Sequence, residues 1–594
     1  MNKKRLFLLG FILCGLLLCC SCKKKDDQKN KPTDNIESTV TEGASDQKNQ
    51  ETTADTQENK TEETEDTKAE NVTYVDYAYD QEPQIIDDIY RTYYEVFLYS
   101  YYDSNGDGIG DINGLIEKLD YLNDGDDSTH TDLGINGIWL MPIMPSTTYH
   151  KYDVIDYYDI DPEYGTLEDF QKLIEECNKR GIKVIIDLVL NHTSTKNEWF
   201  QSAVKSLAIE PCGKKKCKEK DLCREHNPYC QFYNFVEGQP TSGKYYSTGV
   251  GDWYYEAVFW DQMPDLNLGN ENVRSEFEKI MKYWLDMGVG GFRIDAAKEF
   301  YTGNTDKNVE VLSWMTKYVK GLNPDNYLVA EVWDSFGTMS QYYESGIDSL
   351  FNFPFAQEQG KIVTTINYTG DKNSGSSLGR AMVTIQDKFR SLNENAIDAS
   401  FLTNHDTARS AGYFSYNEDK IKLGAGINLM MAGNSFIYYG EELGMSGSGI
   451  DENKRVPMYW SETNTTGMTK GPEKMETMVH KFGTYEDQVN DPLSIYNYYK
   501  RAIQLRNENP EIARGTTAII DSLNQGDLCA ITRTYKDSSI VLLYNISDQE
   551  TTVSLADAQL NVEGIRGYLS VNGAAVTMEG DSVTMPPYSI VVLK

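Results

Sequence analysis

Eight short apolar segments, separated by longer segments with helical periodicity, constrain the fold more than any other feature of this sequence. The run IKVIIDLVL at residues 182–190 is an example, rich in β-branched residues and apolar on both faces. Runs of this kind are typical of parallel strands that are covered on both sides. We expect strands at residues 93–99, 137–142, 182–190, 289–295, 327–331, 350–353, 399–402 and 435–439.

This alternation predicts an α/β fold, a (β/α)8 TIM barrel, built from residues 79–192 and 263–504. Helices are expected at residues 112–122, 167–181 and 493–507, among others. A barrel loop usually has ~2–6 residues, so the long segment at 193–262 predicts an inserted domain B after strand three. Short strands at residues 505–594, such as SSIVLLYNIS, predict a C-terminal all-β sandwich.

The N-terminus has the pattern of a bacterial lipoprotein signal. Basic residues precede an apolar run at 6–18 that is too short to span a membrane, and strongly polar sequence follows Cys22. We predict a signal peptide at 1–22 with Cys22 lipidated; Cys20 as the lipidated residue and a plain secretory signal are the alternatives. Residues 23–78 are almost without apolar side chains and predict a disordered acidic linker. The expected location is the extracellular face of a bacterial membrane, or the medium if the signal is a plain one.

Charge restricts the class of partner. The chain has a formal net charge of −35, whereas nucleic-acid binding needs a basic surface, so nucleic acid is excluded. An acidic surface suits a neutral substrate, and the 41 tyrosines suit sugar rings, whose C–H faces pack on aromatic side chains.

Polar residues lie in or just after the carboxyl ends of four predicted strands, where barrel enzymes place their active sites. These residues are Asp187, Asn191, His192, Arg293, Asp295, Glu331, Asn404, His405 and Asp406. Several carboxylates that converge on one pocket suit glycoside cleavage, which needs a nucleophile and a proton donor. An arginine lowers the pKa of a neighbouring carboxylate, so Asp295 beside Arg293 suits the nucleophile. Glu331 lies in an apolar stretch, which raises a carboxyl pKa and suits the proton donor.

Five segments carry a resemblance to a known family. DLVLNH, GFRIDAAKEF, AEVWD and FLTNHD resemble four segments of the α-amylase family, glycoside hydrolase family 13. MPDLN at 263–267 resembles the fifth, in the form of a group intermediate between oligo-1,6-glucosidases and neopullulanases. The resemblance covers about residues 85–594. It implies a retaining mechanism with Asp295 as nucleophile, Glu331 as general acid/base and Asp406 as transition-state stabiliser. It also implies a substrate site that contains Tyr152, Asp187, His192, Arg293, Lys298, His405 and Arg455.

A glycine-rich acidic loop, DSNGDGIGD at 103–111, places oxygen-bearing side chains at alternate positions, as an EF-hand loop does. Position twelve is Gly114 rather than a glutamate, so no EF-hand is predicted. In the resembling groups the loop after strand one binds calcium. The resemblance implies Ca²⁺ held by the side chains of Asp103, Asn105, Asp107 and Asp111 and the carbonyl of Ile109, with a plain turn as the alternative.

A cluster of cysteines lies in the predicted inserted domain. Cys212, Cys217, Cys223 and Cys230 are separated by four, five and six residues, whereas zinc sites usually contain two-residue spacings. Outside the cell, two disulfides among these residues are therefore the favoured interpretation. His226 offers a further ligand and keeps zinc open as the alternative.

The loop before Tyr152 bears on substrate choice. Strict exo-glucosidases of the resembling family carry an aspartate three residues before the matching tyrosine, and here that residue is Tyr149. Neopullulanases usually carry an extra β-domain before the barrel, which the linker replaces here. We therefore expect a monomeric, endo-acting α-1,4-glucan hydrolase, an α-amylase that degrades starch and maltodextrins. A neopullulanase, a cyclomaltodextrinase or an α-glucosidase is the alternative; a non-catalytic glycan-binding protein is disfavoured because every catalytic position is intact.

Overall fold

A computed structural model describes residues 83–594, apart from residues 215–216, 218–222, 371–372, 559 and 561. The predicted signal peptide, Cys22 and the whole of the predicted linker lie outside the described residues. Within the described part, no helix is both long and apolar enough to cross a membrane.

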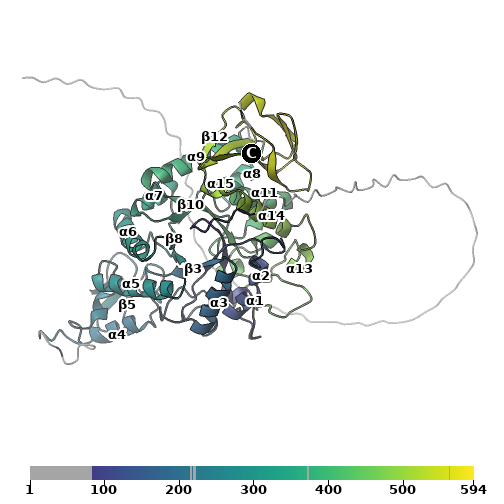
Figure 1. The fold of residues 1–594 in the computed structure, drawn as a ribbon. Coiled ribbons are helices and arrows are strands. Elements are labelled where there is room, and N and C mark those ends of the chain that lie inside the picture. Colours follow the sequence, from purple (N-terminus) through teal and green to yellow (C-terminus); the bar gives the residue numbers. More distant parts are fainter. Residues whose placement is uncertain (1–82, 215–216, 218–222, 371–372, 559, 561) are drawn as a thin grey trace, which may run out of the picture. The chain divides into compact units, whose positions relative to one another are not determined.

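The centre of the fold is a closed barrel of eight parallel strands, as predicted (Figure 1). The order β1-β2-β3-β7-β8-β9-β10-β11 follows the chain, and β1 pairs with β11 to close the ring. Each strand overlaps a predicted segment. β10 begins two residues earlier than predicted, and β1, β9 and β11 begin one residue earlier. The bounds are β1 Thr92–Val96, β2 Gly137–Leu140, β3 Lys183–Leu188, β7 Gly291–Ile294, β8 Tyr327–Ala330, β9 Ser349–Phe351, β10 Ile397–Ser400 and β11 Asn434–Tyr438.

Helices cover the outside of the barrel and bury the outward faces of the strands. Phe292 and Ile294 of β7 are fully buried in this outer core, whereas Trp139 and Phe351 fill the barrel interior. The predicted helix at 112–122 is interrupted at Lys118, whose ψ of 7° ends α1 and begins α2. The covering helices are α1 Ile112–Glu117, α2 Leu119–Leu122, α3 Leu167–Lys179, α5 Glu271–Asp286, α6 Thr305–Leu322, α7 Phe336–Gln341, α8 Lys361–Asn367, α9 Ser374–Leu392, α10 Ser410–Tyr413, α11 Glu418–Leu429 and α14 Ile495–Glu508.

The segment between β3 and β7 contains the expected insertion. It comprises α4 Glu198–Leu207, the short η2 Pro228–Gln231, and an antiparallel sheet of β4 Phe235–Glu237, β6 Trp253–Glu256 and β5 Tyr245–Ser247. Isolated bridges from His192 to Asp265 and from Tyr233 to Leu266 connect this segment to the MPDLN stretch. These bridges fix the insertion beside the carboxyl end of β3.

The C-terminal region forms two antiparallel sheets that share one apolar core. The first contains β12 Thr516–Ile519, β13 Leu528–Tyr535, β14 Ser538–Asn545, β19 Ser589–Leu593 and β16 Ile565–Ser570; the second contains β15 Thr551–Ser554, β18 Ser582–Met585 and β17 Thr577–Glu579. Short helices α12 Asp451–Lys454, α13 Tyr485–Gln488 and α15 Pro510–Arg514 lie in the connections before this region.

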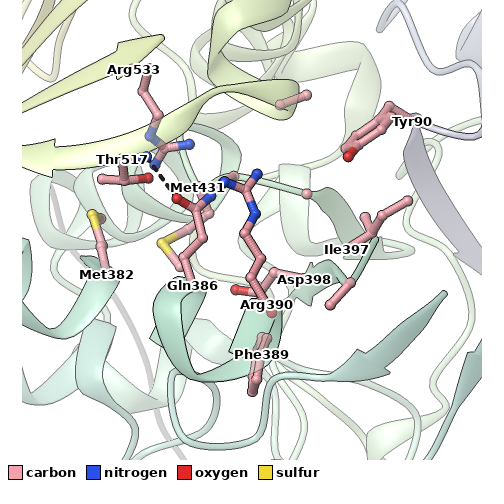
Figure 2. A pocket seen from close by; sticks show the side chains of 14 residues that line it. Tyr90, Met382, Gln386, Phe389, Arg390, Ile397, Asp398, Met431, Thr517 and Arg533 are labelled. Atoms are coloured by element: carbon pink, nitrogen blue, oxygen red, sulfur yellow. Dashed lines mark hydrogen bonds between the residues drawn. The ribbon is translucent and has the colours of Figure 1, made fainter. Parts of the chain in front are cut away.

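Arg533 fastens the first sheet to the barrel. Its buried guanidinium donates to the carbonyls of Ile512, at 2.6 Å, and Met430, at 3.3 Å. Figure 2 shows the small cavity beside it, about 20 Å³, which Gln386 and Thr517 also line. A cavity of that size holds a water molecule at most, so this seam carries no substrate site.

Candidate functional site

A cleft of about 760 Å³ opens at the carboxyl end of the barrel strands. It is the cavity into which the predicted catalytic residues project, and aromatic side chains form much of its wall. Its lining includes Tyr99, Tyr149, Tyr152, His192, Phe259, Trp260, Met263, Asp295, Glu331, Asp406 and Arg455. Cavities of this volume with a few convergent polar groups are typical of small-molecule and oligomer sites.

Arg293 organises the floor of the cleft. It projects inward from β7, and its side chain is 0% exposed. Nη1 donates to Asp187 and to Asp295, each at 2.8 Å, while Nη2 donates to Glu331. One guanidinium thus orients the carboxylates from three neighbouring strands, which is more than the single pairing with Asp295 that the sequence suggested.

The backbone around Asp295 supports this geometry. Gly291 has φ +148°, and a Cβ built there would lie 1.9 Å from the carbonyl oxygen of Tyr327, so only glycine fits at the start of β7. Ala296, directly after Asp295, has φ +44°, a left-handed conformation that residues with a side chain seldom adopt. Strained residues of this kind cluster at active sites, where the surrounding structure holds them.

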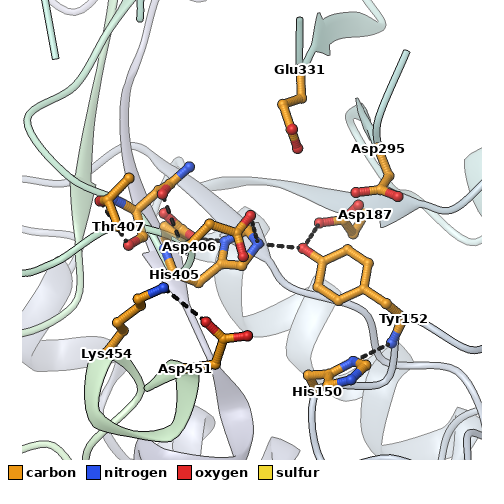
Figure 3. A network of polar contacts seen from close by, with 12 residues as sticks. His150, Tyr152, Asp187, Asp295, Glu331, His405, Asp406, Thr407, Asp451 and Lys454 are labelled. Atoms are coloured by element: carbon orange, nitrogen blue, oxygen red, sulfur yellow. Dashed lines mark hydrogen bonds and ion pairs between the residues drawn. The ribbon is translucent and has the colours of Figure 1, made fainter. Parts of the chain in front are cut away.

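A chain of polar contacts joins Asp187, Tyr152, His405 and Asp406 at the bottom of the cleft (Figure 3). The hydroxyl of Tyr152 donates to Asp187 at 3.0 Å and lies 2.8 Å from His405 Nε2. The same nitrogen of His405 is 3.1 Å from Asp406. Asp406 also accepts from Arg455 Nη2 at 3.0 Å. These contacts bring five of the predicted site residues into a single network.

Glu95 of β1 is a member of the site that the sequence prediction missed. Its carboxylate lies 2.5 Å from His405 Nδ1, and its side chain is 1% exposed. The sequence contains a signal for it, because Glu95 is a charged residue inside the apolar segment YYEVFLY. Arg293 is a charged residue inside β7 in the same way. Glu95 and Asp406 thus contact opposite nitrogens of one imidazole.

The electrostatics divide the carboxylates into two kinds. Burial raises the pKa of Glu331 to about 7, the charges of Asp295 and Asp406 add to the rise, and Arg293 opposes it. Burial alone would also raise the pKa of Asp406, yet His405 and Arg455 hold it well below its usual range. Burial alone would lower the pKa of His405, but Asp406 and Glu95 raise it to about 9. At neutral pH the site therefore contains an ionised Asp406 and a protonated His405, and Glu331 can both give and accept a proton.

The remaining predicted residues lie at the rim or beside the cleft. His192 lines it, with Nε2 3.2 Å from the carbonyl of Tyr152. Lys298 is not among the lining residues: its ammonium donates to the carbonyl of Trp333 at 2.9 Å and lies 3.6 Å from Asp334. Lys298 therefore lies beside the loop that follows β8 rather than in the cleft itself.

The inserted domain contributes an apolar wall that periodicity could not predict. Phe259 and Trp260 line the cleft with exposed fractions of 44% and 41%, and the Phe259 ring contacts His192 edge-on. Large aromatic side chains that stay exposed beside polar catalytic groups are a typical surface for sugar rings.

Nearly all of the barrel matches a known family. A family model described as the catalytic domain of alpha-amylase matches residues 95–515. The chain belongs to the alpha-amylase family. It is therefore a glycoside hydrolase, and the predicted family resemblance is confirmed.

Named relatives of this alpha-amylase-family chain include both amylases and glucosidases. Alpha-amylase 3 of Dictyoglomus thermophilum is 36% identical over 84% of this chain and 92% of its own length. An oligo-1,6-glucosidase of Parageobacillus thermoglucosidasius is 29% identical over 78% and 91%. The solved structure of Amy13B from Eubacterium rectale is 42% identical, with a TM-score of 0.80 over 86% of this chain and 97% of that one. The fold and the glycosidase class agree across these relatives, and their substrates differ.

The acidic loop after β1 has the ligand types that calcium prefers. Asp103 and Asp111, at its two ends, are 7% and 5% exposed, and among the described residues neither forms an ion pair with a lysine, arginine or histidine. Asp103 accepts instead from the backbone N–H groups of Gly106 and Gly108, each at 2.6 Å. Buried carboxylates without a cationic side chain suit a bound cation, so the residues of this alpha-amylase-family loop fit Ca²⁺.

The cysteines of the inserted domain are not paired in the way the sequence favoured. All six cysteines in the described part of the chain are free thiols, so neither expected disulfide is formed. Cys230 lies apart, with its sulfur 3.7 Å from the carbonyl of Ala203. The thiols of Cys212, Cys217 and Cys223 instead cluster with the imidazole of His226.

Proposed function

We propose that this enzyme is a retaining, endo-acting α-1,4-glucan hydrolase, an α-amylase that degrades starch and maltodextrins. The observation that carries the proposal is an open, aromatic-walled cleft in which Asp295, Glu331 and Asp406 face one space. An uncharged Tyr149 stands at the rim position where strict exo-glucosidases carry an aspartate.

The first chemical step uses two of the carboxylates. The Asp295 carboxylate forms a bond to the anomeric carbon while the bond to the leaving sugar breaks, and Glu331 gives its proton to the departing oxygen. In the second step the Glu331 carboxylate takes a proton from water, whose oxygen bonds to the anomeric carbon and displaces Asp295. A pKa of about 7 suits Glu331 to act first as acid and then as base.

The retaining outcome is supported by how Arg293 holds its partners. Asp295 and Glu331 accept from Nη1 and Nη2, the two terminal nitrogens of one guanidinium, so the carboxylates lie close together. Retaining glycosidases separate their carboxyl groups by about 5–5.5 Å, whereas inverting enzymes need about 6.5–9.5 Å to admit a water molecule. Asp406, ionised between His405 and Arg455, would stabilise the positive charge that develops on the sugar.

Internal cleavage is supported by the open rim. The Tyr149 hydroxyl accepts from Arg455 Nη1 at 2.9 Å, so an aromatic ring rather than a carboxylate borders the site. A carboxylate there would hold the terminal sugar of a chain, whereas a ring allows the chain to continue past it. Relatives named alpha-amylase at 36% identity and an alpha-amylase structure from H. orenii at 35% support the same substrate class.

A product time course tests the proposal. Maltoheptaose blocked at its non-reducing end should be cleaved internally, and amylose should give a ladder of maltooligosaccharides before glucose accumulates. Rapid cleavage of isomaltose, together with glucose as the first product from amylose, would instead assign an α-glucosidase. Rapid production of panose from pullulan would assign a neopullulanase.

A calcium ion at the loop after β1 is part of the same proposal. Asp103, Asn105, Asp107, Asp111 and the carbonyl of Ile109 would hold it, and it would order the loop rather than take part in bond cleavage. Addition of a calcium chelator should lower the melting temperature, and added Ca²⁺ should restore it. An unchanged melting temperature would contradict the site.

We also propose that the enzyme acts at the cell surface through a lipid on Cys22, which rests on the sequence pattern of residues 1–22. Mass spectrometry of the mature N-terminus should find a diacylglycerol on that cysteine. An unmodified N-terminal amine would assign a secreted enzyme instead.

A further inference from the structure

Three cysteines and one histidine converge in the inserted domain, away from the residues that line the cleft. The ligand atoms of Cys212, Cys217, Cys223 and His226 all lie within 4.8 Å of one another. In the described part of the chain this is the one group of three or more cysteine, histidine or acidic ligand atoms gathered so closely. We propose that these four residues bind a structural Zn²⁺ ion.

The distances match a tetrahedral site. His226 Nδ1 lies 3.6 Å from the sulfur of Cys212 and 3.7 Å from that of Cys223. Zinc binds sulfur at about 2.3 Å and histidine nitrogen at about 2.0–2.1 Å, so the tetrahedral angle sets neighbouring sulfur and nitrogen ligands about 3.6 Å apart. These two sulfur–nitrogen distances therefore already have the spacing that a zinc ion imposes.

Disulfides fit these positions poorly. The cluster contains an odd number of thiols, so one disulfide would leave a third thiol without a partner. The only other cysteine of the inserted domain, Cys230, has its sulfur beside the carbonyl of Ala203 on α4. A metal ion uses all three sulfurs and the imidazole together, which no arrangement of disulfides does.

Two of the ligands are held in place by a turn that is anchored to α4. The carbonyl of Cys223 accepts from the backbone N–H groups of His226, at 2.9 Å, and Asn227, at 2.8 Å. Asn227 is 3% exposed, and its amide donates to the side chains of Ser202 and Ser206 on α4. This turn brings the Cys223 sulfur to 3.7 Å from His226 Nδ1, across a two-residue spacing that an inspection of the cysteines alone does not reveal.

The described residues of this segment bury few side chains, so a metal crosslink would help to order it. No helix or strand is assigned between Leu207 and Pro228 in its described residues, and of these only Cys223 and Asn227 are buried. Loops longer than about 12–15 residues without secondary structure are uncommon in compact domains unless something else orders them. Arg224, inside the turn, lies 5.1 Å over the ring of Trp253, so a metal held there would also fix the turn against β6.

The ligand set selects the metal and its role. Thiolates and imidazole favour zinc over calcium or magnesium, which prefer oxygen. Four protein ligands leave no open position for water or substrate, so the ion would be structural rather than catalytic. This site is independent of the α-glucan specificity proposed above.

Metal analysis of the full mature protein tests the site. Protein purified without chelator should contain about one zinc per chain by mass spectrometry of the metal. Replacement by Co²⁺ should give the intense visible absorption of a tetrahedral cobalt thiolate. Cys223→Ser should lose the zinc and the cobalt spectrum, and Cys230→Ser is the matched control that should keep both.

Wild-type protein provides the measurement that does not depend on a variant's folding. A zinc-selective chelator, added in excess calcium, should release the metal, expose three further thiols to a thiol reagent and lower the melting temperature by more than about 3 °C. Readdition of Zn²⁺ should reverse these changes. A disulfide between any two of Cys212, Cys217 and Cys223 in the freshly purified protein, or a protein without stoichiometric metal, would overturn the proposal.

Discussion

The carboxylates at the bottom of the cleft and the cysteine–histidine cluster differ in the cation that offsets their negative charge. Both bring several potential anions into a small volume. At the cleft the chain supplies its own cation, because Arg293 contacts Asp187, Asp295 and Glu331 from a fully buried position. In the inserted domain the clustered side chains are three thiols and an imidazole.

The supports of the two clusters differ as well. The groups around Arg293 project from adjacent, hydrogen-bonded strands, so their relative positions are fixed by the barrel. The three clustered cysteines lie on a partly exposed segment whose described residues contain no strand. A self-contained charge network on rigid strands suits catalysis, whereas a cluster that awaits a cation suits crosslinking. The following experiments test that contrast, from the largest expected effect on activity to the smallest.

Removal of the nucleophile should have the largest effect. Asp295→Asn keeps the shape of the side chain but removes the attacking charge, so kcat/KM on starch should fall by more than about 10⁴-fold. Initial rates of reducing-sugar release measure it, and the melting temperature checks that the fold is intact. Starch hydrolysis at the wild-type rate would refute the assignment of Asp295.

The proton donor should set the alkaline limit of activity. Glu331 must be protonated to act as an acid, and its raised pKa of about 7 means that this form is lost as pH rises through that value. The pH profile of kcat/KM should therefore decline above about pH 7. Glu331→Gln should lower kcat by about 10²–10⁴-fold and abolish the alkaline decline. A profile that stays flat well above pH 7 would contradict the role of Glu331.

The shared cation should matter through its geometry as well as its charge. Arg293→Lys retains a positive charge, but a single ammonium cannot present two forked nitrogens to three carboxylates. We expect kcat/KM to fall by about 10²-fold, because misplacement of catalytic groups by about 1 Å costs that much. An altered alkaline pKa in the pH profile distinguishes lost positioning of Glu331 from a simple loss of folded protein. Wild-type kcat in the lysine variant would show that charge alone suffices.

The fold and the catalytic carboxylates could be predicted from sequence because both depend on local patterns. Continuous apolar runs mark strands. Asp295 and Glu331 directly follow β7 and β8, and Asp406 lies in the loop after β10. The contact of Glu95 with His405 joins residues 310 positions apart and exists only once β1 closes the barrel against β11.

Functional residues of the inserted domain could not be predicted, because their positions do not follow from local sequence patterns. Its strands are short, so periodicity does not locate Phe259 or Trp260 at the cleft wall. Cysteine spacing alone could not separate Cys230 from the other three. What separates them is a backbone turn between Cys223 and His226 and the anchoring of Asn227 on α4, and neither is visible as a sequence pattern.

A change at the rim should alter where the glucan is cut rather than how. Tyr149→Asp places a carboxylate beside Arg455, within reach of a terminal sugar. The ratio of terminal to internal cleavage should rise by about 10-fold, since a new hydrogen-bonding group is worth about 1–2 kcal/mol of discrimination. Product analysis on blocked and unblocked maltoheptaose measures the ratio, and Tyr149→Phe is the control without a charge. An unchanged product pattern would show that Tyr149 does not determine internal cleavage.

The cysteine–histidine cluster should affect activity least, which is the sharpest test of the contrast. Cys223→Ser removes one of four ligands, and none of the four lines the cleft, so kcat/KM at 25 °C should stay within about 2-fold of wild type. Cys223→Ser should nevertheless be inactivated faster than Cys230→Ser at elevated temperature, because it has lost the metal crosslink. If both variants lost activity equally at 25 °C, the inserted domain would need its cysteines for more than a metal, and the cluster would no longer be separable from catalysis.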